Sequence, residues 1–305
     1  MKIGLVGLPK SGKTTLFNAL TNSQAEVSAY GGGKTEPNRA SVAVEDERLT
    51  RLSEIVKPKK TIYVRLDLMD FAGFSSQDTE TPDFSPELLQ LIRLNDALAV
   101  VLRNFPRDIE DDPSPIERLS MIESEFLLAD HIIVENRLER IEKTRRTGQF
   151  TPLLESELKL LKRIETFLDS GLPLREMELE EGEKKAVNGF KFLTLKPVMV
   201  VLNSSEENFG QNQPVLDELN KRYPTIECAV NFEMELAQLD DEAEIQAFLA
   251  DIGITESARI RLTKTAFDML GYISFFTIGK DEVRAWNIVR GETALDAAGS
   301  VHTDM

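Results

Sequence analysis

The chain has 305 residues, 41% hydrophobic and 29% charged, a composition that excludes wholesale disorder and allows a full domain with smaller units beside it. Its 52 acidic residues against 36 basic ones give a net charge of −16, which disfavours generic attraction to nucleic acid. The single cysteine, Cys228, excludes an internal disulfide, and no apolar run approaches the length of a membrane span, so we expect a cytoplasmic protein that does not enter a membrane.

The first predicted elements are a strand over Ile3 to Val6 and a helix over Thr14 to Leu20. The turn between them matches the pattern G-x-x-x-x-G-K-[ST], which begins at Gly7. Glycine lets successive backbone N–H groups face phosphate oxygens, and the helix directs its positive N-terminal end at the same charge. We therefore predict a loop that binds a nucleoside polyphosphate through Pro9, Lys10, Ser11, Gly12, Lys13, Thr14 and Thr15.

Two side chains of this loop have chemical roles in the prediction. Lys13 would contact the β- and γ-phosphates, and the Thr14 hydroxyl would bind Mg²⁺. A glycine-rich turn without a ligand is the alternative, and the motif together with its two flanking elements disfavours it.

Further strands alternate with helical patterns along the chain. This alternation predicts an α/β fold with a doubly wound, mostly parallel sheet, whose ligand-binding loops follow the carboxyl ends of the strands. The predicted strands cover Ala40 to Val44, Thr61 to Leu68, Ala97 to Leu102, Val198 to Leu202 and Ile226 to Val230.

DFAG, which follows the predicted strand Thr61 to Leu68, offers a second part of the site. Asp70 could hold Mg²⁺, and the Gly73 N–H could sense a γ-phosphate. A tight turn without a ligand is the alternative reading. Phe74 follows, where Ras-type GTPases carry a glutamine that orients the attacking water, so either another group such as Gln77 positions the water or turnover is slow.

The residues after Leu202, NSSE, stand where GTPases read guanine with N-K-x-D. Ser204 replaces the lysine and Glu206 replaces the aspartate, so guanine selectivity should be poor and adenine becomes admissible. The alternative is that NSSE only ends a strand. The residues expected at the base are Asn203, Ser205, Glu206, Cys228 and Ala229, with Cys228 favoured as a small buried residue over a redox-sensitive thiol.

A long segment without strand patterns, Pro113 to about Lys185, interrupts the sheet. Apolar residues recur in it at helical spacing on either side of TRRTGQFTP, which predicts an inserted hairpin of two long antiparallel helices. Its turn end could meet RNA or an acidic partner, or could be a solvated face balanced by Glu135, Glu139 and Glu142. The two apolar series are Leu119, Ile122, Phe126, Ala129, Ile133 and Leu154, Leu158, Leu161, Ile164, Leu168, and the cations are Arg137, Arg140, Lys143, Arg145 and Arg146.

From Tyr272 onward, alternating apolar and polar residues around Gly279 to Asp281 predict a β-hairpin, and a short helix follows. Such a unit is marginal alone, so we expect it either to pack on its neighbours or to belong to a longer parent. The sequence does not decide whether Met305 is the natural end.

These segments together resemble the Obg-like ATPase (YchF) family, above all GLPKSGKTTLFNAL, MDFAG, IRLNDALAVVLRNF, FLTLKPVMVVLNSSE and EVRAWNIVRGETALDAAGSVHTDM. The resemblance implies a Ras-like P-loop NTPase domain with an inserted helical hairpin domain and a partial C-terminal TGS unit of β-grasp type. It also implies ATP hydrolysis in preference to GTP and association with ribosomes. The implied boundaries are 1–112 and 186–270 for the NTPase domain, 113–185 for the insertion and 271–305 for the TGS unit.

The chain departs from the family pattern near the γ-phosphate. Lys34 stands where the family has threonine, Thr35 is displaced by one position, and SSQDTETPDFSPE replaces a lysine- and glycine-rich loop. Lys10 and Ser11 replace asparagine and valine.

The functional prediction is a monomeric, Mg²⁺-dependent ATPase that acts as a molecular switch on the ribosome or ribosomal RNA. Lys13 and Gly73 would be catalytic, and Thr14 and Asp70 would hold the metal. Three alternatives stay open: a nucleotide-gated binding module with negligible hydrolysis, a GTP-preferring GTPase, and a small-molecule kinase.

Overall fold

The computed structural model describes residues 1–22, 37–71, 84–105, 112–148, 150–239, 241–251 and 253–301. Several residues named above lie outside these ranges, so the expectations about them stay predictions. They are Lys34, Thr35, Gly73, Phe74 and Gln77.

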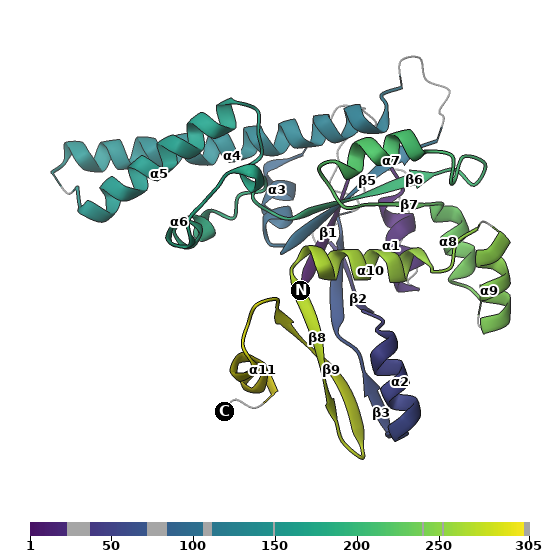
Figure 1. Ribbon diagram of the computed structural model, residues 1–305. Coiled ribbons are helices and arrows are strands. Elements are labelled where there is room, and N and C mark those ends of the chain that lie inside the picture. The colour runs from purple at the N-terminus through teal and green to yellow at the C-terminus, as the bar shows by residue number, and fades with distance from the viewer. Residues whose placement is uncertain are drawn as a thin grey trace.

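Within the described residues, six strands form a central sheet in the order β2-β4-β1-β5-β6-β7 (Figure 1). β2 runs antiparallel to β4, and the other neighbouring strands pair in parallel. This arrangement confirms the predicted α/β fold with a mostly parallel sheet. The strands are β1 (Lys2–Val6), β2 (Asn38–Ala43), β4 (Arg65–Asp70), β5 (Ala97–Asn104), β6 (Val198–Ser204) and β7 (Thr225–Cys228).

Helices cover both faces of this sheet, which is why β5 and β6 are almost entirely apolar and buried. Alternate residues of β5 point to opposite faces: Val101 joins the core cluster beneath α1 and α10, whereas Val100 joins the cluster beneath α3, α4 and α7. The helices around the sheet are α1 (Lys13–Thr21), α2 (Glu47–Val56), α3 (Pro86–Arg93), α7 (Gln213–Asn220), α8 (Val230–Leu236), α9 (Glu242–Asp251) and α10 (Ala258–Met269).

Two predicted strands need correction. The run Thr61 to Leu68 is not one strand, because β3 (Lys60–Ile62) leaves the main sheet and pairs in parallel with β9, and β4 begins only at Arg65. The run Ile226 to Val230 is also too long, since β7 ends at Cys228 and Val230 begins α8. Apolar periodicity could not show either change, because both depend on which segment the backbone pairs with.

The inserted segment contains two long helices, α4 (Pro115–Arg146) and α5 (Pro152–Asp169), which project from the sheet side by side (Figure 1). A capping box between Ser114 and Glu117 begins α4. The first half of α4 packs on the sheet through residues such as Ile122, whereas Val134 and Ile141 pack against α5. Shorter helices follow at η1 (Leu174–Glu176), α6 (Glu181–Val187) and η2 (Asn188–Phe190).

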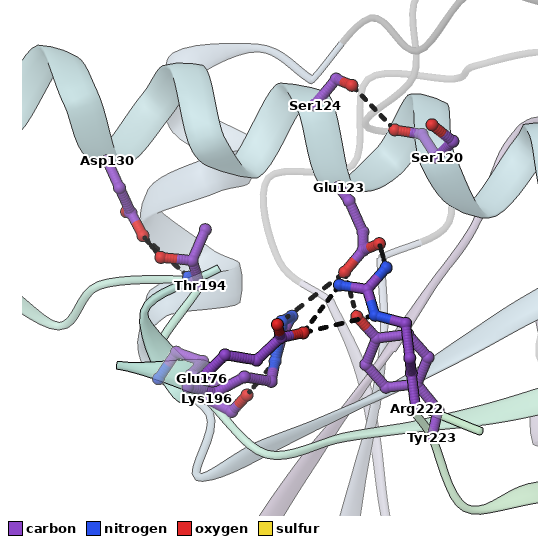
Figure 2. A network of polar contacts seen from close by, with 10 residues as sticks. Ser120, Glu123, Ser124, Asp130, Glu176, Thr194, Lys196, Arg222 and Tyr223 are labelled. Atoms are coloured by element: carbon purple, nitrogen blue, oxygen red, sulfur yellow. Dashed lines mark hydrogen bonds and ion pairs between the residues drawn. The ribbon is translucent and has the colours of Figure 1, made fainter. Parts of the chain in front are cut away.

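Polar contacts hold α4 on the sheet domain (Figure 2). The fully buried Asp130 carboxylate accepts hydrogen bonds from the backbone N–H groups of Leu193 and Thr194 at 3.0 and 2.7 Å, and from the Thr194 hydroxyl at 2.8 Å. Arg93 at the end of α3 forms an ion pair with the same carboxylate at 2.6 Å. About two turns earlier on α4, Glu123 accepts from the Tyr223 hydroxyl, as Figure 2 shows.

The C-terminal unit consists of β8 (Tyr272–Ile278), β9 (Glu282–Val289) and α11 (Ala294–Val301), and its hairpin confirms the predicted one. β9 pairs with β3 on its other side, and Val283 is buried in the main core cluster. The unit therefore packs on its neighbours. Among the described helices, none is both long enough and apolar enough to cross a membrane.

We expect Asp130→Ala to lower the free energy of unfolding by about 3 to 5 kcal/mol, because the largely buried Arg93 loses its carboxylate partner and two backbone N–H groups lose their acceptor. Urea unfolding followed by circular dichroism measures this change. Glu139→Ala, on an exposed part of the same helix, is the control and should change stability by less than about 1 kcal/mol. Equal effects of the two variants would contradict a structural role for Asp130.

Candidate functional site

The phosphate loop between β1 and α1 has the close packing that its glycines predict. A side chain at Gly7 would place its Cβ 2.5 Å from the Val101 carbonyl oxygen. Gly12 has a φ of 93°, and a Cβ there would lie 2.3 Å from the Asn203 Nδ2 atom. Both motif glycines are therefore required by the fold itself.

The start of α1 is arranged to receive an acceptor. Gly12 is the N-cap residue, and within the described residues no side chain caps this end of the helix. The first backbone N–H groups of a helix have no partner inside it. The loop therefore presents donors and the positive end of a helix dipole to the same place.

Lys13 lies across this loop. Its Nζ atom donates hydrogen bonds to the carbonyl oxygens of Gly7 at 2.9 Å and Leu8 at 2.8 Å. Burial lowers the pKa of Lys13 to about 8, and the charge of Asp70 partly opposes that shift. An ammonium group held mainly by neutral carbonyls is poised for a stronger anionic partner.

Thr14 and Asp70 meet beside Lys13, as the sequence predicts for a metal site. The Thr14 hydroxyl donates to Asp70 Oδ2 at 3.0 Å, and Asn38 Nδ2 donates to the same oxygen at 3.1 Å. Asp70 is fully buried, and its Oδ1 atom has no hydrogen-bond partner among the described residues. A hydroxyl beside a carboxylate with a free oxygen suits a hard cation such as Mg²⁺.

Sequence reasoning missed Asn38 as part of this site. The residue directly follows the TEP segment and begins β2, whose first residue pairs with Asp70. A polar residue at the start of a strand, just after the segment expected near the γ-phosphate, was the available signal.

On the base side, Asn203 contacts two loops. Its Nδ2 atom donates to the Ser11 carbonyl oxygen at 2.9 Å, and its Oδ1 atom accepts the Val230 N–H at 3.3 Å. The side chain is buried, so Asn203 connects the phosphate loop with the segment after β7.

The other residues expected at the base differ in how far they are exposed to solvent. Ser205 is partly exposed and Glu206 is exposed, whereas Ala229 is the buried N-cap residue of α8. Cys228 is fully buried in the core cluster that includes α1 and α10. Burial raises the pKa of its thiol to about 12. This placement agrees with the favoured reading of Cys228 as a small buried residue.

The phosphate loop, the acid at the end of β4 and the inserted helices have counterparts in known proteins. Residues 2–137 match a family model described as 50S ribosome-binding GTPase. The ribosome-binding ATPase YchF of Pasteurella multocida is 34% identical over 312 residues, which cover 99% of this chain and 85% of that protein. The chain belongs to the YchF family.

Other YchF proteins agree with this assignment. YchF of Bacillus subtilis is also 34% identical, over 99% of this chain and 84% of its own length. The structure of the Schizosaccharomyces pombe YchF GTPase superposes with a TM-score of 0.85 at 31% identity, over all of this chain and 84% of that one. Residues 272–305 match a model of the C-terminal part of YchF GTPases, described as a protein of unknown function. The resemblance seen in the sequence is confirmed.

The buried thiol of this YchF chain should be unreactive while the protein is folded. With a pKa near 12 instead of about 8.5, Cys228 should react with iodoacetamide roughly a thousandfold more slowly than a free thiol. Mass spectrometry measures the labelled fraction at this sole cysteine, and the guanidinium-unfolded protein serves as the control. Labelling of the native protein at the unfolded rate would contradict the buried placement.

Proposed function

We propose that this YchF protein binds a purine nucleoside triphosphate with Mg²⁺ and hydrolyses its γ-phosphate, with ATP favoured over GTP. The observation that carries the proposal is the phosphate loop, in which the partly buried Lys13 ammonium and the uncapped start of α1 lie beside Thr14 and Asp70. Relatives described as ribosome-binding ATPases support it.

The residues of the site would have separate roles. Thr14 and Asp70 would hold Mg²⁺, which when bound neutralises charge on the phosphates. Lys13 would exchange the carbonyl oxygens of Gly7 and Leu8 for phosphate oxygens. Its charge would then stabilise the charge that develops on the transferred phosphoryl group, and the Gly73 N–H would sense the γ-phosphate.

The preference for ATP is supported by the position of Ser204. This serine stands where guanine-reading proteins carry a lysine, but its side chain is buried, where it accepts from Asn104 Nδ2 and donates to Glu227. Position 204 therefore supplies no lysine stem to pack along the base. We infer that Asn203, Ser205, Glu206 and the backbone at Cys228 and Ala229 surround a purine with little demand for guanine.

We further propose that the turn end of the α4–α5 hairpin contacts the ribosome, and that the protein acts in the cytoplasm where ribosomes are. Arg137 is held by Glu157 at 2.7 Å. Arg140 and Arg146 are exposed and form no ion pair with the described residues, so their charge is available for phosphate groups.

Lys13→Ala should lower the hydrolysis rate by at least about a hundredfold, because it removes the cation that stabilises the transition state. Labelled analogues of ATP and GTP are first titrated to measure binding. The hydrolysis rate is then measured as phosphate release with each nucleotide. Lys159→Ala, exposed on α5, is the control and should hydrolyse normally.

Unchanged hydrolysis in Lys13→Ala would contradict the assignment of this loop as the active site. Binding by the unmodified protein without phosphate release would favour a nucleotide-gated module, and tighter binding of GTP would contradict the base preference.

Reversing two charges at the hairpin turn, Arg140→Glu with Arg146→Glu, should abolish co-sedimentation with ribosomes and leave ATP hydrolysis unchanged. Phosphate contacts made by each cation disappear and repulsion replaces them. Lys159→Glu on α5 is a matched control. Undiminished co-sedimentation of the double variant would place the ribosome contact elsewhere.

A further inference from the structure

A buried carboxylate lies beneath the segment that would read the base. Glu227 of β7 is only 7% exposed. Its Oε1 atom accepts hydrogen bonds from the Ser204 hydroxyl at 2.6 Å and from Asn212 Nδ2 at 2.5 Å, and its Oε2 atom accepts the Gly210 N–H at 3.2 Å. All three donors belong to the segment 204–212, which we call the base loop. One carboxylate therefore holds both ends of this loop.

The two ends of the base loop are also joined to each other. Asn212 Nδ2 donates to the Ser204 hydroxyl oxygen at 3.2 Å and to the Asn208 carbonyl oxygen at 2.6 Å. Asn104 at the end of β5 donates to Ser204 as well, at 2.9 Å. Glu206, in contrast, is exposed. Its backbone belongs to a loop whose two ends are held by buried contacts.

Glu227 also adjoins the second segment expected near the base. Its own carbonyl oxygen accepts a hydrogen bond from Arg261 Nη1 of α10 at 2.7 Å. Cys228 follows directly and pairs with Asn203 in the sheet. Glu227 therefore adjoins both base-side segments: its side chain contacts the base loop, and its backbone leads directly into Cys228.

The chemistry of the donors explains why a carboxylate stands here. The groups that donate to it are a hydroxyl, an amide and a backbone N–H, all neutral, so among the described residues no ion pair offsets the cost of burying the charge. A carboxylate offers acceptors on both oxygens, whereas a glutamine would turn an NH₂ group toward at least one of the donors. Only the acid can accept from the two loop ends on one oxygen and from the Gly210 N–H on the other.

We propose that Glu227 is a positioning residue for base recognition, which fixes the base loop so that Ser205 and Glu206 meet the purine. It sets the ATP-to-GTP selectivity without contacting the nucleotide. The inference rests on the function proposed above, because it concerns the base side of the same site.

The test compares Glu227→Gln with the unmodified protein in three titrations, with ATP, GTP and inorganic tripolyphosphate, all with Mg²⁺. We expect ATP affinity to fall about tenfold and the ATP-to-GTP ratio to approach one, since one hydrogen bond in the loop anchor becomes a donor–donor contact. Tripolyphosphate has no base, so its affinity should change less than about twofold. Glu218→Gln, exposed on α7, is the matched control and should behave as the unmodified protein.

A second variant removes the opposite side of the same contact. Ser204→Ala removes one donor to the Glu227 carboxylate and should reduce selectivity in the same direction. Combining it with Glu227→Gln should cost less than the sum of the two single losses, because both variants weaken the same loop anchor. Ser204→Ala alone also serves as the test if circular dichroism shows that Glu227→Gln does not fold. Additive losses in the double variant would overturn the shared role.

Two further results separate this proposal from the function on which it rests. Unchanged selectivity in folded Glu227→Gln, or an equal loss of tripolyphosphate and ATP binding, would overturn the positioning role alone. Failure of the unmodified protein to bind tripolyphosphate and both nucleotides would overturn the proposed function, and the positioning role with it.

Discussion

The candidate site depends on one close approach, in which the phosphate loop lies against the end of β6. The Asn203 amide donates to the Ser11 carbonyl oxygen and leaves no space for a side chain at Gly12. The same side chain accepts the Val230 N–H and so places the start of α8 as well. In the sheet β5 lies between β1 and β6. The contact between the loop after β1 and the end of β6 therefore depends on the strand order, which brings both to the same edge of the sheet.

Around this contact the protein buries charges whose partners are incomplete. Lys13 is held by two backbone carbonyl oxygens, and Asp70 retains an oxygen without a hydrogen bond among the described residues. Such groups lower stability unless something completes their interactions. A phosphate anion and a hard cation arriving together would satisfy both, so the arrangement that costs stability is the one that favours a ligand.

The inserted hairpin packs on the sheet domain at one end and projects away from it at the other (Figure 1). Asp130 marks the point where α4 changes its packing partner from the sheet to α5. Arg93 reaches the same carboxylate from α3, which begins at Pro86, shortly after the segment expected to respond to the γ-phosphate. Arg93 therefore joins the end of α3 to the base of the hairpin.

By itself, the sequence determined the phosphate loop, the acid that ends β4, the mostly parallel sheet and the two long helices. Each of these depends on residue types at short, fixed spacing, which local periodicity records. Only the tertiary structure decided that β3 leaves the sheet for β9, that Asn203 connects two loops, and that Ser204 contacts Glu227, 23 residues away. Pairing between distant segments depends on packing of the whole chain, and no local pattern specifies it.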